Sequence, residues 1–403
     1  LAAPLIDGVL RQGHKMLIAG PSKAGKSFAL IELSIAISEG RKWMGWQCAK
    51  GRVLYVNLEL DRASCLHRFR DVYEALGWRA GNLGNIDVWN LRGKSVPMDR
   101  LAPKLIRRAA KKDYVAIIID PIYKVITGDE NSADQMARFC NQFDLVCTEL
   151  GCAVIYCHHH SKGSQGGKKS MDRASGSGVF ARDPDALLDL IGLETTEALV
   201  KQEENKAVCA ACRQYLDRHF TGWEENVSPD DMLSSVQMLD YCRKKLSAAQ
   251  YTELNAICFA VAEKAREKTA WRIDGTLREF PKFDPVNLWF DYPVHRTDDA
   301  GCLKDIQPDE EKPVWQKAAE NRKKQAEDKR LKKRNEFEIE FSNIELDGRE
   351  VSAQELAEKL ETSSKELLAW FGDGKRQKRD LKKDFEKYIG EDGKTYIRRG
   401  AHD

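Results

Sequence analysis

Short apolar runs alternate with amphipathic stretches from residue 1 to residue 193. Each run is too apolar for a strand with one face in water, so helices are expected to cover both faces of a buried sheet. The runs that we predict to be strands are, in chain order, Lys15–Ala19, Val53–Asn57, Val115–Asp120, Ala153–Cys157 and Ala186–Leu190. The alternation predicts an α/β domain built on a parallel sheet.

The rest of the chain changes character along its length. Residues 194–268 favour helix and predict a helical insertion, after which residues 271–295 return to a strand-like pattern. We therefore predict one α/β domain over residues 1–300. The charged stretch at 301–340 predicts a helical linker, and residues 341–403 are expected to form a compact unit of their own.

Composition narrows the class of protein. With 42% hydrophobic residues the chain is expected to be globular, and it shows neither a signal peptide nor an apolar run of the ~20 residues that a membrane helix needs. Its eleven cysteines lack framework spacing, which favours reduced thiols in a cytoplasm. Cys209 and Cys212 have no second pair at zinc spacing, so we interpret them as a chance placement. The net charge of +2 requires any affinity for nucleic acid to come from local patches.

A glycine-bearing loop follows the first predicted strand and precedes a predicted helix, in the pattern GxxxxGK[ST]. Backbone N–H groups in such a loop surround the phosphates of a nucleotide, so we predict binding of ATP with Mg²⁺. Lys26 is expected to reach the β- and γ-phosphates, and the Ser27 hydroxyl to ligate magnesium. The predicted nucleotide-binding residues are Gly20, Pro21, Ser22, Lys23, Ala24, Gly25, Lys26 and Ser27.

Two other predicted strands end in acidic residues. Asp120 closes an apolar strand, where a carboxylate that organises magnesium is expected, although an Asp that caps a helix has the same pattern. Glu59 follows the strand at Val53–Asn57 and is expected to polarise the water that attacks the γ-phosphate. The alternative is an exposed Glu that opens the next helix.

Three adjacent histidines follow the strand at Ala153–Cys157. Neighbours on an extended chain point to opposite faces, so His158, His159 and His160 cannot easily converge on one metal ion. We expect His158 or His159 to act instead as a polar sensor that hydrogen-bonds the γ-phosphate, with a purely structural role as the alternative.

Together these features resemble the RecA-superfamily ATPases, and most closely the plasmid RepA-like hexameric helicase group. The matching elements are the GPSKAGKS loop, the strand ending NLEL, the IIIDP strand, the strand ending CHHHSKG, and the segment Arg173–Asp185. The resemblance spans Pro4–Leu193. It implies a RecA-like sheet, a homo-oligomeric and hexameric ring, and an active site between neighbouring subunits.

The same resemblance implies an arginine that completes the site of the next subunit. Arg182 falls at that position, and Arg173 is the second choice. A structural Arg182, paired with Asp183 or Asp185, is the alternative.

Between the histidines and Arg173 lies a glycine-rich, basic loop. In RecA-like rings such a loop enters the central channel, which implies that Lys162, Lys168 and Lys169 bind single-stranded DNA through its phosphates. A disordered surface loop is the alternative.

The C-terminal pattern looks like a winged helix. Helices are predicted at 351–360 and 365–371, followed by a basic stretch and a hairpin at 385–397. The basic residues expected to contact duplex DNA are Lys375, Arg376, Lys378 and Arg379, with Arg398 and Arg399 on the wing. A protein-binding winged helix is the alternative.

These features predict an ATP-driven motor on DNA, a ring helicase that serves replication of a plasmid, phage or other mobile element. A non-translocating ATPase switch that controls assembly on DNA is the alternative. A small-molecule kinase is disfavoured, because a flexible basic loop stands where a substrate lid is needed.

Overall fold

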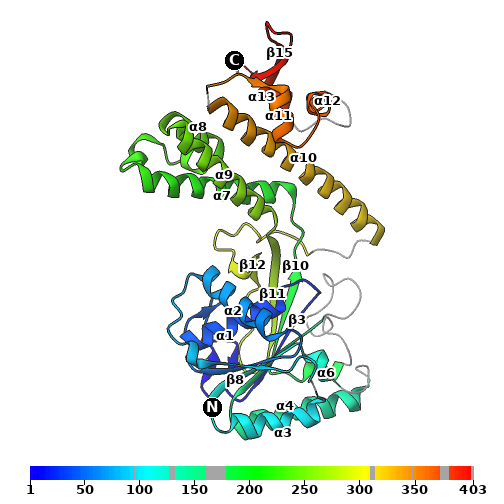
Figure 1. The fold of residues 1–403 in the computed structure, drawn as a ribbon. Helices are drawn as coiled ribbons and strands as arrows, with labels where there is room; N and C mark the ends of the chain where they lie inside the picture. The colour runs from blue at the N-terminus through cyan, green and yellow to red at the C-terminus, as the bar shows by residue number, and fades with distance from the viewer. Residues whose placement is uncertain are drawn as a thin grey trace. The chain divides into compact units, whose positions relative to one another are not determined.

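The computed structural model describes residues 1–94, 96–126, 132–159, 178–308, 314–346, 348–372 and 381–400. The chain forms two compact units, each assembled from two separate stretches (Figure 1). We call residues 1–196 with 268–311 the sheet unit, and residues 197–267 with 312–403 the helical unit.

A nine-stranded sheet forms the centre of the sheet unit, in the order β13-β12-β11-β10-β3-β9-β8-β6-β7. Its strands are β3 (Lys15–Gly20), β6 (Arg52–Asn57), β7 (Ile86–Asn90), β8 (Tyr114–Asp120), β9 (Ala153–His159), β10 (Ala186–Gly192), β11 (Thr269–Leu277), β12 (Val286–Asp291) and β13 (Val294–Thr297). The six strands from β10 to β7 run parallel, whereas β11, β12 and β13 are added antiparallel. The predicted α/β class is confirmed, and each of the five predicted strands is present.

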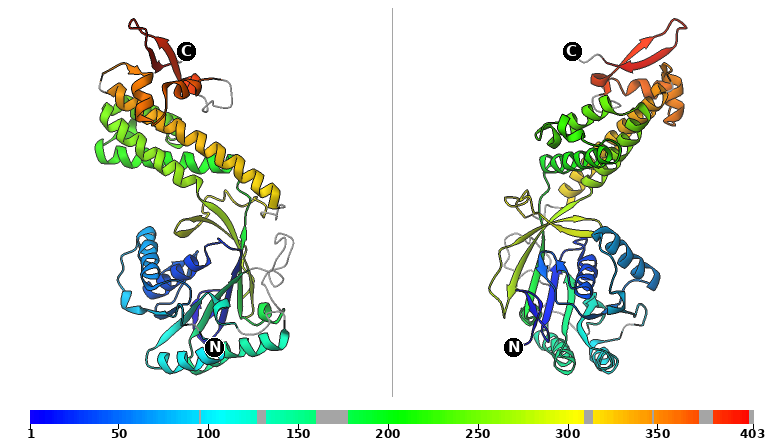
Figure 2. Two further views of the ribbon diagram at one scale, coloured as in Figure 1. Left: turned by 45° about the vertical axis from the view of Figure 1, so that its right-hand side comes forward. Right: turned by 90° about the vertical axis from the view of Figure 1, so that its left-hand side faces the viewer.

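Helices cover both faces of this sheet (Figures 1 and 2). On one face, α1 (Lys26–Glu39) and α2 (Arg62–Leu76) bury apolar side chains against β3, β6 and β10. On the other face, α3 (Met98–Ala109) and α4 (Ala133–Leu150) do the same. The two cores explain why the strands lack polar alternation.

Short elements complete the sheet unit. They are the hairpins β1 (Pro4–Ile6) with β2 (Leu10–Arg11) and β4 (Lys42–Trp43) with β5 (Trp46–Gln47), the 3₁₀ turns η1 (Leu83–Asn85) and η2 (Ile122–Lys124), and the helix α6 (Gly178–Arg182).

The first part of the helical unit is a small bundle with its own core. Its elements are α7 (Glu197–His219), η3 (Trp223–Asn226), η4 (Asp231–Leu233), α8 (Ser235–Lys245) and α9 (Ala248–Arg266). Tyr215, Trp223 and Met238 are buried in this core, as are Cys209 and Cys212. The described residues include all eleven cysteines; none of them forms a disulfide, and ten are buried.

The second part of the helical unit contains α10 (Val314–Leu346), β14 (Val351–Ser352), α11 (Ala353–Lys359), α12 (Ser364–Ala369), α13 (Leu381–Asp384), β15 (Phe385–Ile389) and β16 (Thr395–Arg399). The strands form a sheet in the order β14-β16-β15. The boundary expected at residue 340 falls inside α10, because the last turns of this helix place Phe337, Phe341 and Ile344 in the C-terminal core. These residues recur at spacings of four and three, so they form one apolar stripe on a helix that is otherwise charged.

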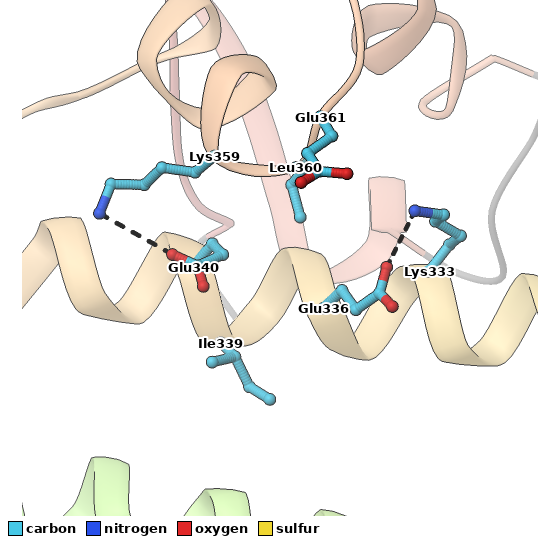
Figure 3. Close-up of a pocket in the computed structure, with 7 residues that line it drawn as sticks. All are labelled: Lys333, Glu336, Ile339, Glu340, Lys359, Leu360 and Glu361. Carbon is cyan, nitrogen blue, oxygen red and sulfur yellow. Dashed lines mark ion pairs between the residues drawn. The ribbon is translucent and has the colours of Figure 1, made fainter.

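A hollow on the surface of this part lies between α10 and the end of α11 (Figure 3). Its lining consists of Lys333, Glu336, Ile339, Glu340, Lys359, Leu360 and Glu361. Glu336 pairs with Lys333 at 3.0 Å and Glu340 with Lys359 at 3.8 Å, so the charges of the hollow are largely balanced.

Within the described part of the chain, no helix combines the length and the apolar character needed to cross a membrane.

Candidate functional site

The predicted site residues follow the carboxyl ends of neighbouring parallel strands. The β3–β9 register sets Ala19 beside His158 and Gly20 beside His159, and the β6–β8 register sets Asn57 beside Asp120. Because parallel strands end at one edge of a sheet, the loops after β3, β6, β8 and β9 converge there.

The loop after β3 folds around the Lys26 ammonium. Lys23 and Gly25 have φ values of 70° and 72°, which turn the chain between the strand and α1. The Lys26 Nζ donates hydrogen bonds of 2.8 Å to the carbonyls of Gly20 and Pro21. Burial lowers the pKa of Lys26, and the negative charges near it oppose that shift. The loop therefore holds a cation at its centre.

Asp120 is the acceptor for three side chains. The Ser27 hydroxyl donates to its Oδ1 at 3.1 Å, the Tyr55 hydroxyl to its Oδ2 at 2.5 Å, and the Cys157 thiol to its Oδ1 at 3.2 Å. Burial and then the Asp120 charge raise the pKa values of Tyr55 and Cys157, so both remain protonated donors. Neither had been predicted.

Ser27 and Asp120 have the chemistry of a magnesium site. A hydroxyl and a carboxylate in direct contact offer two hard oxygen ligands, and Mg²⁺ completes its shell with waters and substrate phosphates. The pair therefore fits the predicted role for this ion, which neutralises phosphate charge when it is bound.

Glu59 is exposed, just beyond the end of β6. The Asn57 side chain fixes the turn that carries it, since Asn57 Oδ1 accepts from the N–H groups of Leu60 at 2.9 Å and Glu59 at 3.3 Å. Tyr123, in the turn after Asp120, donates to Glu59 Oε1 at 3.4 Å. The carboxylate is therefore held at the edge where the phosphate loop lies.

Two of the three adjacent histidines are described, and they have different surroundings. His158 is buried, whereas His159 is exposed with its Nδ1 3.4 Å from Lys26 Nζ. His159 also lies 6.2 Å from the Tyr123 ring. Of the two, His159 is therefore the one beside Lys26. Among the residues that the structure describes, no group of three or more metal-binding side chains occurs.

Arg182 lies at the opposite end of the sheet. It ends α6, and the Asp185 N–H that follows donates to the carbonyl of Lys15, the first residue of β3. Since β3 has six residues, this end lies roughly 17 Å from the phosphate loop along the strand. Arg182 is exposed, and it does not join Lys26 and Asp120 in the same subunit.

The acids next to Arg182 are engaged by other cations. Asp183 accepts from Lys15 at 2.7 Å, and Asp185 accepts from Arg278 at 2.8 Å. Arg278 also donates to the backbone carbonyl of Arg182 at 3.1 Å, which fixes the chain at this point.

Two aromatic side chains lie close to the start of α1, and they were not predicted. Phe28, directly after Ser27, makes an edge contact with Tyr292 at 5.2 Å between ring centroids. The Arg68 guanidinium lies 4.9 Å above the Phe28 ring. Tyr292 is 58% exposed, so it offers an aromatic surface beside the phosphate loop.

Several predicted residues lie outside the described ones. These are the third histidine of the run, the second candidate arginine and every predicted DNA contact except Arg398 and Arg399: His160, Lys162, Lys168, Lys169, Arg173, Lys375, Arg376, Lys378 and Arg379.

A family model matches the part of the chain that contains the loop after β3. Residues 2–165 match a family model described as an AAA domain. Among solved structures, the ATPase domain of G40P is similar, with a TM-score of 0.38 and 13% sequence identity, over 69% of this chain and 82% of that chain. The family match covers the phosphate loop, both acids and the described histidines, and it supports ATPase activity of the P-loop type.

Proposed function

We propose that this protein hydrolyses ATP to drive movement on DNA, as a ring-forming helicase of the RepA-like group in a plasmid, phage or other mobile element. The main support for this proposal is that Lys26, the Ser27–Asp120 pair and Glu59 lie at the same edge of the sheet. These are the parts that phosphoryl transfer needs: a cation for the phosphates, oxygen ligands for magnesium and a base for water.

The proposed reaction is hydrolysis of the β–γ bond of ATP. Glu59 accepts a proton from water as the water oxygen attacks the γ-phosphorus, and the bond to the β-phosphate oxygen breaks to leave ADP and phosphate. Lys26 stabilises the charge on the transferred group, and His159 beside it is placed to hydrogen-bond the γ-phosphate.

The position of Arg182 favours a site shared between subunits. Its side chain is exposed at the sheet end opposite its own phosphate loop, so only another copy of the chain can bring it to that loop. We therefore assign Arg182 as the arginine that completes the neighbour's site in a homo-oligomeric ring, with a hexamer as the expected size.

The basic loop after His159 is the proposed contact for single-stranded DNA. Its lysines at 162, 168 and 169 are set among glycines, which suits phosphate contact without a fixed register.

The order of elements at the C-terminus supports a winged helix. A helix (α10), a short strand (β14), two helices (α11 and α12) and a hairpin (β15–β16) follow one another, and β14 pairs with β16. Arg398 and Arg399 on the hairpin pair with Glu386 at 3.2 Å and Glu345 at 3.0 Å. Exposed pairs of this kind are weak, so phosphates can compete for both arginines.

The aromatic surface beside the loop is proposed to hold the nucleotide base. Phe28 directly follows Ser27, and its ring contacts that of Tyr292 at 5.2 Å between centroids, so the two rings offer stacking surfaces for the base.

A test of this function measures ATPase rate with and without single-stranded DNA, and then strand displacement on a forked duplex. We expect DNA to stimulate hydrolysis, ATP to drive unwinding, and Lys26→Ala to abolish both activities. Stimulation without unwinding would support the DNA-bound switch instead. An ATPase indifferent to DNA would reject both functions, and a protein that hydrolyses no ATP would reject the site itself.

A further inference from the structure

His295 lies against the phosphate loop from a strand that carries none of the predicted site residues. It belongs to β13, the last strand of the antiparallel addition, and its side chain is fully buried. Its Nε2 lies 3.2 Å from the carbonyl oxygen of Ala24, inside the loop, and its Nδ1 lies 2.7 Å from Glu32 Oε1 on α1. The backbone N–H of His295 donates to both Glu32 carboxylate oxygens, at 3.1 and 3.2 Å.

The partners of the imidazole determine where its protons lie. A carbonyl oxygen only accepts, so the contact with Ala24 requires a proton on Nε2. One further proton is shared between Nδ1 and the Glu32 carboxylate. Burial raises the pKa of Glu32, and the contacts with His295 oppose that rise. In either arrangement of the shared proton the pair is neutral overall, which suits its burial, and Nε2 stays a donor.

The contact with Ala24 fixes the orientation of a peptide plane in the loop. The peptide bond between Ala24 and Gly25 is trans, so the Gly25 N–H points away from the Ala24 carbonyl. With that carbonyl held by His295, the N–H is directed to the other side of the loop. Backbone N–H groups on that side are the ones that bind phosphate oxygens.

Packing reinforces the same constraint. A Cβ on Gly25 would lie 3.0 Å from His295 Cε1 and 3.1 Å from the Phe290 ring. The imidazole and the phenyl ring therefore close the underside of the loop, and Gly25 with φ of 72° is confined between them and the phosphate side.

We propose that His295, oriented by Glu32, is a positioning residue that holds the Ala24–Gly25 peptide in the phosphate-binding orientation. This proposal rests on the proposed function, since it assumes that the loop binds ATP. It assigns a role to the antiparallel strands: they bring a buried donor to the loop from a distant part of the chain. A histidine that merely stabilised the fold would affect stability but would not affect phosphate binding separately.

Two substitutions separate these roles, because the side-chain amide of each one can replace only one of the two imidazole nitrogens. In His295→Gln the side-chain amide nitrogen is as many bonds from Cα as Nε2, so it can still donate to Ala24. In His295→Asn the amide nitrogen matches Nδ1, so it keeps the contact with Glu32 and loses the one with Ala24. Affinity for ATP and ADP, kcat, KM and the midpoint of thermal unfolding are measured for both variants, the wild type and Lys26→Ala.

We expect the Asn variant to bind ATP about tenfold more weakly than the wild type, and the Gln variant to stay within about threefold, at similar unfolding midpoints. Equal affinities in the two variants, or losses that follow stability alone, would overturn the proposal. If the wild-type protein bound no nucleotide, the proposed function itself would be rejected. A comparison of the two variants alone cannot give that result.

A measurement on the wild type keeps the test independent of whether the variants fold. ¹⁵N spectra of the histidine side chains should show His295 Nε2 carrying a proton that exchanges slowly with solvent. An unprotonated Nε2 in the folded protein would contradict the proposal directly.

Discussion

At the scale of single residues, the two carboxylates of the site differ: one is buried and fixed, and the other is accessible to solvent. Asp120 is buried and accepts from Ser27, Tyr55 and Cys157, so its position is fixed before any ligand binds. Glu59 is exposed and has a long contact with Tyr123. A fixed carboxylate suits metal organisation, whereas an accessible one suits proton transfer with water.

Glu59→Gln should therefore impair the chemical step and spare binding. We expect kcat to fall by about 10²- to 10⁴-fold, the usual contribution of a general base, with ATP affinity little changed. Single-turnover hydrolysis and equilibrium binding of ATP measure the two effects. Glu149→Gln, an exposed acid on α4, is the matched control and should leave both unchanged. If the Glu59→Gln variant remained fully active, another group would have to act as the general base.

The residues found from sequence are those whose roles follow from local order. Lys26, Ser27 and Asp120 lie next to a strand end, and parallel strands bring such ends together without further information. Tyr55 and His295 were missed for different reasons. Tyr55 looks like any apolar strand residue, and the contact between His295 and Ala24 joins positions 271 residues apart.

At the scale of elements, ion pairs hold the amino end of β3 in place. The buried Lys15 side chain pairs with Asp144 of α4 at 2.6 Å and with Asp183 before β10 at 2.7 Å. Burial lowers the pKa of Lys15, but the hydrogen bonds to Asp144 and Asp183 outweigh it and the net shift is upward. One ammonium group thus joins β3, α4 and the segment between α6 and β10.

The sign of this shift gives a stability prediction. A raised pKa means that the stabilisation is complete below the ordinary value of 10.5 and is lost as pH rises through the higher folded value. Lys15→Met should destabilise the protein by about 1–3 kcal/mol at pH 8, and the difference from wild type should shrink at pH 11 and above.

Urea unfolding followed by circular dichroism at both pH values measures the difference. Lys42→Met, an exposed lysine on β4, should show little effect at either pH. A Lys15 difference that grew with pH would mean that the ion pairs do not stabilise the fold.

The positions of helices and strands along the chain were easier to predict than the unit to which each one belongs. The strands were located because their apolar runs are local, and the C-terminal helices and hairpin for the same reason. The charge of α10 masked its apolar stripe, so the predicted boundary at residue 340 divided Phe337 from Phe341 although their four-residue spacing was visible in the sequence.

At the scale of the whole molecule, the proposed function makes the site incomplete within one chain. Lys26 and Asp120 lie at one end of the sheet and Arg182 at the other, so a shared site requires a head-to-tail ring in which each subunit supplies both halves.

Mixing two inactive variants tests this arrangement. Lys26→Ala and Arg182→Ala should each lack ATPase activity alone, the arginine being worth about 10³- to 10⁵-fold in rate. Mixed subunits should recover up to about a quarter of wild-type activity, because some interfaces then join an intact loop to an intact arginine.

ATPase assays after co-refolding or subunit exchange give the result, with Arg138→Ala, an exposed arginine on α4, as an active control. No recovery from an exchanging oligomer would overturn the assignment of Arg182 to the neighbour's site.

The distance in sequence between Ala24 and His295 has a consequence for synthesis. A ribosome finishes the phosphate loop, both acids and the histidines by residue 159, but it makes His295 only 136 residues later. At about 5–20 residues per second that gap lasts roughly 7–27 s. During this interval the nascent chain carries every recognisable nucleotide-binding motif but lacks the strand that braces the loop. Full affinity for nucleotide should therefore arise only after the helical insertion has been made.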